Sequence, residues 1–177
     1  HANSGGAIEF SLSVVGSQVT DCVFDGNSAG QDGGAIRANI AVVDVERCTF
    51  HGTGGSSTLA MISSTLTVNA CVIAGNVGDP LSCGNGSPIV SCCDVWGNAA
   101  GDTFCGTDGG GNFSTDPRFC DAAAGDLQLL PDSPCLDGQH PDGAACGTIG
   151  ALGPCPGTGV GDGVVTDGWS RVKSRYR

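Results

Sequence analysis

The sequence predicts an all-β fold, a right-handed parallel β-helix of about four to five coils that ends in a disulfide-containing cap and a short tail. Of its 177 residues, 31 are glycine and 8 are proline, a composition that favours tight turns over helices. A cysteine-centred motif recurs along residues 1–100, and no repeat contains a helical periodicity. We expect the coils in residues 1–111, the cap in 112–156, and a Gly-rich linker with a basic amphipathic tail in 157–177.

The recurring motif reads V-x-x-C-x-Φ-x-G-N/T, where Φ is apolar, and it occurs four times with cysteines 26, 23 and 22 residues apart. A period of this length with strand-like alternation indicates a solenoid. The motif lacks the leucine ladder of a leucine-rich repeat. Parallel strands stack about 4.8 Å apart. Equivalent residues of successive coils are therefore expected to lie above one another, with about three short strands in each coil.

Stacking of the motif predicts three columns of side chains. Free thiols pack as small apolar residues, although cysteines on neighbouring coils also lie within bridging range; we expect Cys22, Cys48 and Cys71 to be free. Corner amides can hydrogen-bond along such a stack, and the glycine before each corner suits a positive φ. The columns are Cys22, Cys48, Cys71 and Cys93; Phe24, Phe50, Ile73 and Val95; and Asn27, Asn76 and Asn98.

Two motifs in the first hundred residues are similar to those of a known group. FxxN at 24–27 and GGAI at 33–36 resemble the repeats of polymorphic outer-membrane proteins and related right-handed β-helix proteins of bacteria. GGAI is missing from the third and fourth repeats. The resemblance implies a secreted bacterial β-helix repeat protein.

Residues 112–156 resemble the closing segment of secreted bacterial β-helix repeat proteins. The shared order is N-x-x-x-D-P-x-F, G-D-x-x-L, S-P-C and I-G-A. The open end of a β-helix exposes unpaired backbone groups and an apolar cross-section. We therefore expect this segment to cover the last coil with Phe119, Leu127, Leu129 and Leu136.

Eleven cysteines indicate an oxidising compartment, and hence a secreted, extracellular or cell-surface protein. Zinc sites use CxxC pairs or clusters of Cys and His; no CxxC pair occurs, and the three histidines are scattered, so we expect no zinc site. The odd count leaves at least one thiol free or linked to another chain. We expect Cys83 to pair with Cys92 or Cys93, and Cys135 with Cys146, although a sequence does not fix connectivity. The candidate disulfide cysteines are Cys83, Cys92, Cys105, Cys120, Cys135, Cys146 and Cys155.

Both ends of the sequence suggest contacts. Trp169, Val172 and Tyr176 share one face of a helical pattern in a basic tail, which is either a docking element for the acidic body or a solvated terminus. Nothing before Gly5 is expected to cap the first coil, so that end either continues upstream or pairs with another molecule.

The composition excludes some function classes. A net charge of −11 disfavours nucleic-acid binding, and no apolar run reaches the roughly 20 residues needed to span a bilayer. Glycoside hydrolysis needs two facing carboxylates, whereas Asp21, Asp44 and Asp94 occupy different positions of the repeat. We expect no cofactor or metal site, beyond weak surface calcium at the Asp-rich turn 108–111.

The expected function is a non-catalytic extracellular scaffold, a cell-surface or matrix component that associates end to end into a fibre. The first alternative is a carbohydrate-binding or adhesive module, for which Trp96 is the candidate aromatic side chain. The second alternative is a polysaccharide-degrading enzyme.

Overall fold

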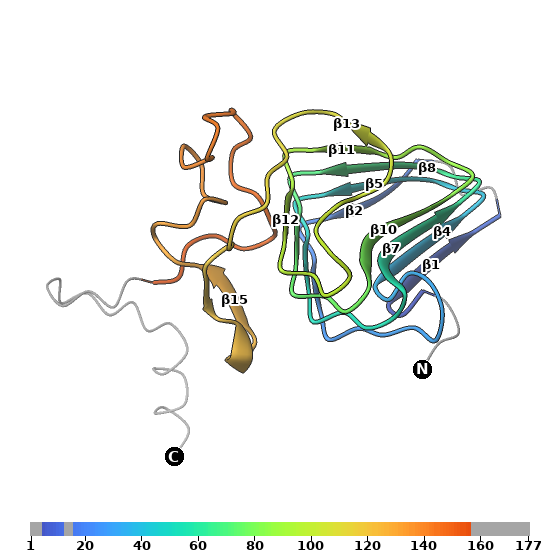
Figure 1. Cartoon of the computed structure of the whole chain (residues 1–177), viewed down its shortest axis with the longest axis horizontal. Coiled ribbons are helices and arrows are strands. Elements are labelled where there is room, and N and C mark those ends of the chain that lie inside the picture. Colours follow the sequence, from blue (N-terminus) through green and yellow to red (C-terminus); the bar gives the residue numbers. More distant parts are fainter. Residues whose placement is uncertain (1–4, 13–15, 157–177) are drawn as a thin grey trace, which may run out of the picture.

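The computed structural model describes residues 5–12 and 16–156, and it shows a parallel β-solenoid (Figure 1). Three parallel sheets each collect one strand from every turn of the winding chain. The first contains β1 (Ile8–Ser11), β4 (Ile36–Asn39), β7 (Ser57–Ile62) and β10 (Asp79–Gly84). The second contains β2 (Ser17–Thr20), β5 (Val42–Glu46), β8 (Thr65–Asn69), β11 (Ile89–Ser91) and β13 (Thr107–Asp108). The third contains β3 (Val23–Asp25), β6 (Thr49–His51), β9 (Val72–Ala74) and β12 (Asp94–Trp96).

The predicted all-β solenoid is confirmed, but its coil count was too high. The chain completes about three turns between β1 and β10, which gives four strand layers rather than four to five full coils. A fifth layer is incomplete: it contains the two-residue strand β13 and a single parallel bridge from Phe113 to Asp94. The chain leaves the stack after this bridge, so no complete further coil forms.

The core lies inside the three sheets, because residues alternate between inward and outward positions along each strand. In β5 and β8 every second residue is buried. Phe24 pairs in register with Phe50, Phe50 with Ile73, and Ile73 with Val95. The two phenyl rings stack with centroids 4.8 Å apart. These four side chains form one continuous apolar column through the layers.

All three corners of each coil use a left-handed backbone, including the one between the first and second sheets, for example at Ile40 with φ +55°. Gly26, Gly52, Gly75 and Gly97 have φ between +62° and +67°, which glycine adopts without strain. The corner that precedes each motif cysteine is left-handed too, although it carries non-glycine residues such as Arg47, with φ +47°. There the Arg47 guanidinium donates to Asp21 of the adjacent layer (2.8 Å) and lowers the pKa of that carboxyl.

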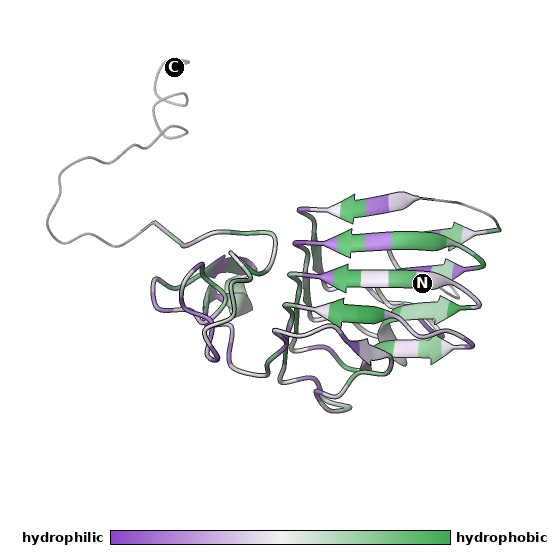
Figure 2. Cartoon of the chain, turned by 90° about the horizontal axis from the view of Figure 1, so that it is seen from above, coloured by the Kyte–Doolittle hydropathy of each residue, from purple (hydrophilic) through white to green (hydrophobic). Residues whose placement is uncertain are grey.

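The C-terminal segment lies beside the stack instead of covering its end (Figure 2), which corrects the position expected for the cap. It contains β14 (Phe119–Asp121), the 3-10 helix η1 (Ala122–Ala124) and β15 (Asp126–Leu129). Leu129 packs with Val72 and Ala74 on the outer face of the third sheet. That face carries apolar residues at two neighbouring outward positions, so it gains most from being covered.

Phe104, in the loop after β12, covers part of the apolar core at the end of the stack, which we expected the cap to do. It packs against the main core together with Cys83 and Cys105. Within the described part of the chain, no helix has the length and apolar character required to cross a membrane.

Candidate functional site

The structure brings the four motif cysteines together as a thiol column (Cys22, Cys48, Cys71 and Cys93), and all four are free. The Cys48 N–H donates to Cys71 Sγ, and the Cys71 N–H donates to Cys93 Sγ, with a nitrogen–sulfur distance of 3.4 Å in each case. Each thiol also donates to the carbonyl two residues before it, at 3.1–3.3 Å. The thiols therefore satisfy inward-facing backbone groups while they fill the core.

Burial suppresses the reactivity of Cys71 in the middle of this column. It raises the pKa of the Cys71 thiol well above the ordinary value of 9.0, and its neighbours in the column raise it further. The hydrogen bond with Cys71 instead lowers the pKa of Cys48. The thiolate is the nucleophile and the metal ligand of cysteine chemistry, so the buried Cys71 thiol is a packing element. Within residues 5–12 and 16–156, no group of three or more His, Cys, Asp or Glu could hold a metal ion.

Asn112 ends the thiol column, a role that the sequence analysis missed. Its Oδ1 accepts from the Cys93 N–H (2.9 Å), and its Nδ2 donates to the Val90 carbonyl (2.7 Å). The signal was present, because Gly111 and Asn112 stand where earlier repeats have a left-handed residue followed by cysteine. An amide replaces the thiol at the point where regular coils stop.

The corner residues form a second, amide column of Asn76 and Asn98. Asn76 Oδ1 accepts from the Thr53 N–H (2.9 Å), and Asn98 Oδ1 accepts from the Asn76 N–H (3.1 Å). Asp102 ends this column by accepting from the Asn98 N–H (2.8 Å). Burial would raise the pKa of Asp102, but hydrogen bonds from Asn98 and Gly97 outweigh it and lower the pKa. Asn27 occupies the same corner in the first layer, where its carbonyl accepts from the Gly54 N–H.

Thr53 interrupts the amide column, because it places a hydroxyl where the third and fourth layers have an asparagine amide. It holds the corner position of the second layer, and its buried Oγ1 has no hydrogen-bond partner among the described residues. An unsatisfied buried hydroxyl costs about 1–3 kcal/mol. We expect Thr53→Asn to raise the free energy of unfolding by about 1–2 kcal/mol in urea titrations.

Thr53→Val is the matched control for this substitution. It removes the unsatisfied hydroxyl at similar volume but adds no amide, so we expect a smaller gain than for Thr53→Asn. A Thr53→Asn protein less stable than Thr53→Val would show that the second layer does not accept an amide at this corner.

The three disulfides differ from the expected pairs. They join Cys83 to Cys105, Cys92 to Cys146 and Cys120 to Cys155, while Cys135 is a free, buried thiol. The pairing of Cys83 with Cys92 or Cys93 and that of Cys135 with Cys146 were therefore wrong. Position in the stack decides the pairing, since Cys83 and Cys105 are 22 residues apart and occupy adjacent layers. Three disulfides indicate an oxidising environment.

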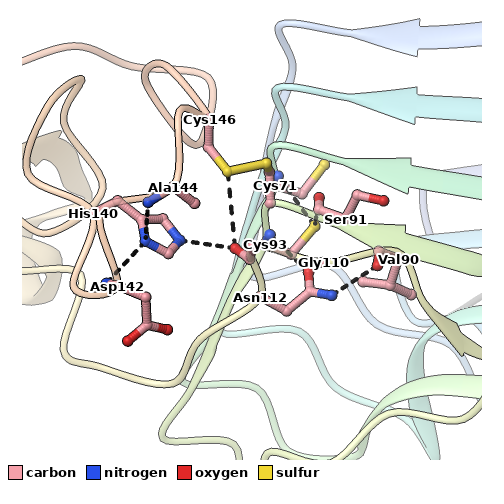
Figure 3. The surroundings of a disulfide bond; sticks show 12 residues. Cys71, Val90, Ser91, Cys93, Gly110, Asn112, His140, Asp142, Ala144 and Cys146 are labelled. Carbon is pink, nitrogen blue, oxygen red and sulfur yellow. Dashed lines mark hydrogen bonds between the residues drawn. A yellow bond between two sulfur atoms is a disulfide. The ribbon is translucent and has the colours of Figure 1, made fainter.

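The Cys92–Cys146 disulfide and His140 together fasten the C-terminal segment to the last coil (Figure 3). The ring Nε2 of His140 lies 2.9 Å from the Gly111 carbonyl, which only accepts, so Nε2 carries the proton. Nδ1 then accepts from the Asp142 and Ala144 N–H groups. The neutral imidazole thus joins two loops that the disulfide holds side by side.

A buried carboxyl lies between the solenoid and the C-terminal segment. Asp94 Oδ1 accepts from the Thr115 N–H (3.1 Å), and Oδ2 accepts from the Cys135 thiol (3.2 Å). Its side chain is fully buried. Burial raises the pKa of Asp94 from 3.8 to about 7, although both hydrogen bonds oppose the shift. Burial and the Asp94 charge raise the pKa of Cys135.

Beside this carboxyl, a cavity of about 280 Å³ opens between the third sheet and the C-terminal segment. The solenoid contributes His51, Ala74 and Trp96, which are outward-facing residues in one column. The C-terminal segment contributes chiefly Asp116, Arg118 and Phe119. The sequence analysis named Trp96 as a candidate for ligand contact. It missed His51, Arg118 and Phe119, because only docking of the C-terminal segment brings these residues together.

The candidate docking residues Trp169, Val172 and Tyr176 lie outside the described residues. Comparison with protein-family models, curated proteins and solved structures finds no match to this chain. The resemblance to polymorphic outer-membrane repeats and to the closing segments of bacterial β-helix proteins therefore stays a prediction. The structure itself shows a disulfide-bonded parallel β-solenoid.

Proposed function

We propose that this protein is a secreted, non-catalytic extracellular scaffold that associates end to end through its first strand layer. The proposal rests on the unpaired strand edges and the partly buried apolar residues of that layer. Among the described residues, β1, β2 and β3 each pair with another strand on one side only. Ile8, Phe10 and Cys22 pack on the core there yet stay only partly buried. An unpaired strand edge beside an apolar surface favours strand addition.

The parallel register of the stack makes a second copy a suitable partner. Every pair in the three sheets of the solenoid is parallel, and most strands keep strict register with their neighbours. The last layer of another molecule can extend the second sheet through β13, which among the described residues pairs with a strand on one side only. Contacts of this head-to-tail kind produce filaments when they do not close into rings.

Three disulfides support an extracellular setting for this scaffold. The thiol and amide columns support a structural role, because the inward cysteines and the corner amides bond to backbone groups of neighbouring layers. These groups are committed to holding the stack rather than to a reactive centre.

Size-exclusion chromatography with light scattering, followed by negative-stain microscopy, tests the association. We expect species larger than the 17.5 kDa monomer, growing with concentration. Lysines on an edge strand discourage strand pairing, so Ser11→Lys with Gln18→Lys should reduce the assembly to monomer. Both side chains are exposed in the first layer.

Thr65→Lys with Val77→Lys is the matched control. It adds the same charge at exposed positions of the third layer, away from the edge, and should leave assembly intact. A monomer at every concentration, or equal loss of assembly in both double variants, would contradict end-to-end association.

A further inference from the structure

The cavity between the third sheet and the C-terminal segment supports a second activity beyond the scaffold role. We propose that it binds a single ring of a neutral sugar at the surface of a glycan. Its volume of about 280 Å³ lies just below the roughly 300–1,000 Å³ of pockets that hold drug-sized ligands. A space of this size suits one sugar ring rather than a peptide segment or an extended chain.

Two ring side chains and a glycine line the solenoid side of this cavity. Asp25, His51, Ala74 and Trp96 follow one another on successive strands of the third sheet. His51 and Trp96 are two strand spacings apart, or about 9.6 Å. Ala74 between them is covered, since it packs in one cluster with Leu129, and Gly75 beside it is exposed and adds no side chain. Gly75 therefore leaves space in the cavity, with His51 and Trp96 among its lining residues.

Trp96 is the apolar contact in this cavity. Its side chain is 37% exposed, whereas Ala74 one layer away is 1% exposed. A large aromatic side chain left partly in water beside a cavity is available to contact a ligand. The C–H face of a sugar ring is a suitable partner, because it is apolar while the ring edge carries hydroxyls.

His51 supplies a polar ring of fixed orientation. Its Nδ1 lies 2.9 Å from Asp25 Oδ1, and an ionised carboxylate only accepts, so Nδ1 carries the proton. Nε2 is the ring nitrogen that is left for a ligand hydroxyl, which can both donate and accept. This edge of the ring faces Gly75, where an added Cβ would lie 3.4 Å from Nε2. Phe119 holds the other side of the imidazole in an edge-to-face contact, with centroids 5.8 Å apart.

Arg118 and Asp116 add a donor and an acceptor from the opposite wall. The backbone N–H of Arg118 donates to Asp116 Oδ1 (2.8 Å), which fixes the orientation of the carboxylate. The Arg118 guanidinium is ion-paired with Asp132, and a guanidinium has five N–H donors to distribute. Hydroxyl groups both donate and accept, so they match a wall that offers both.

The charge of the site favours a neutral ligand over an anionic one. Asp132 offsets the charge of Arg118, and the whole chain carries a net charge of −11. A uronic acid would meet repulsion from the body of the protein. A neutral hexose or N-acetylhexosamine would not.

A ¹H–¹⁵N NMR titration of the full chain tests the proposal. The probes are the methyl glycosides of glucose, galactose, mannose and N-acetylglucosamine and their trisaccharides, with methyl glucuronide as the charged comparison. We expect at least one neutral sugar to shift amides of residues 51, 74–75, 96, 116 and 118–122, with a Kd on the order of 1 mM. Trp96→Ala should weaken that binding about tenfold, and Trp96→Phe should restore part of it.

Ile89→Ala is the matched control, since it removes a similarly exposed apolar side chain from the second sheet. It should leave sugar binding unchanged. The proposal is overturned if no neutral sugar shifts these amides at tens of millimolar, if only the glucuronide does, or if folded Trp96→Ala binds as the parent does. End-to-end association of Trp96→Ala should match the parent, so the two functions can fail separately.

Discussion

Replacing Asn76 by alanine is expected to lower the free energy of unfolding by about 3–5 kcal/mol. The Asn76 amide accepts from the Thr53 N–H and donates to the Phe50 carbonyl and Asn98 Oδ1. Its side chain is 1% exposed. Alanine would remove the side-chain bonds to the Thr53 N–H and the Phe50 carbonyl, while Asn98 Oδ1 would keep only the bond from the Asn76 N–H. Each buried group left unsatisfied costs about 1–3 kcal/mol, and the cavity left by the missing amide adds to the loss. Neighbouring water and local relaxation recover part of the sum.

Urea unfolding monitored by circular dichroism measures this effect. Asn69→Ala is the matched control, because Asn69 lies at an outward position of β8 and is only half-buried. It should change the free energy by less than about 0.5 kcal/mol. Equal losses in the two variants would mean that the amide column does not hold the layers together.

Asp94→Asn is expected to stabilise the protein at neutral and alkaline pH. The pKa of Asp94 is raised from 3.8 to about 7 because the carboxyl is buried between the solenoid and the C-terminal segment. Between about pH 4 and pH 7 the folded protein keeps this proton while the unfolded chain has released it. Stability therefore falls as the pH rises through this window, and it stays at the lower level above it.

The neutral asparagine removes this dependence. One pKa unit corresponds to about 1.4 kcal/mol, so a shift of this size gives a gain of about 2–4 kcal/mol at pH 8 and almost none at pH 4. The asparagine carbonyl can still accept from the Thr115 N–H, and its amide can meet Cys135 Sγ.

Thermal and urea unfolding of both proteins from pH 4 to pH 8 measures the difference. Asp137→Asn makes the same chemical change at an exposed carboxylate and should follow the parent at every pH. If Asp94→Asn also parallels the parent across this range, the carboxyl does not titrate within the interface. A destabilised Asp94→Asn protein at pH 8 would show that the ionised form is the one that the interface requires.

The cysteine spacing carried most of the information about the fold. Periods of 26, 23 and 22 residues predict a stack, and in the structure Cys48 and Cys71 each bond to the next layer. The same rule could have found the Cys83–Cys105 disulfide, since its cysteines are one period apart. We instead expected cysteines close in sequence to pair, but stacking places residues one coil apart nearest to one another.

The position of residues 112–156 was not accessible in the same way. It depends on an apolar patch at Val72 and Ala74, which in the sequence look like ordinary members of short alternating strands. Docking on that patch determines the Cys92–Cys146 and Cys120–Cys155 disulfides and the burial of Asp94. It also creates the cavity beside Trp96. Tertiary contacts between distant segments decide these features, so no local pattern reveals them.

The most direct test of the stacked-coil account is disulfide mapping of the unreduced protein by mass spectrometry, with free thiols alkylated before and after unfolding. The account predicts the pairs Cys83–Cys105, Cys92–Cys146 and Cys120–Cys155. Cys48, Cys71, Cys93 and Cys135 should react only after unfolding. A disulfide within the thiol column, or rapid alkylation of Cys71 in the folded protein, would contradict it.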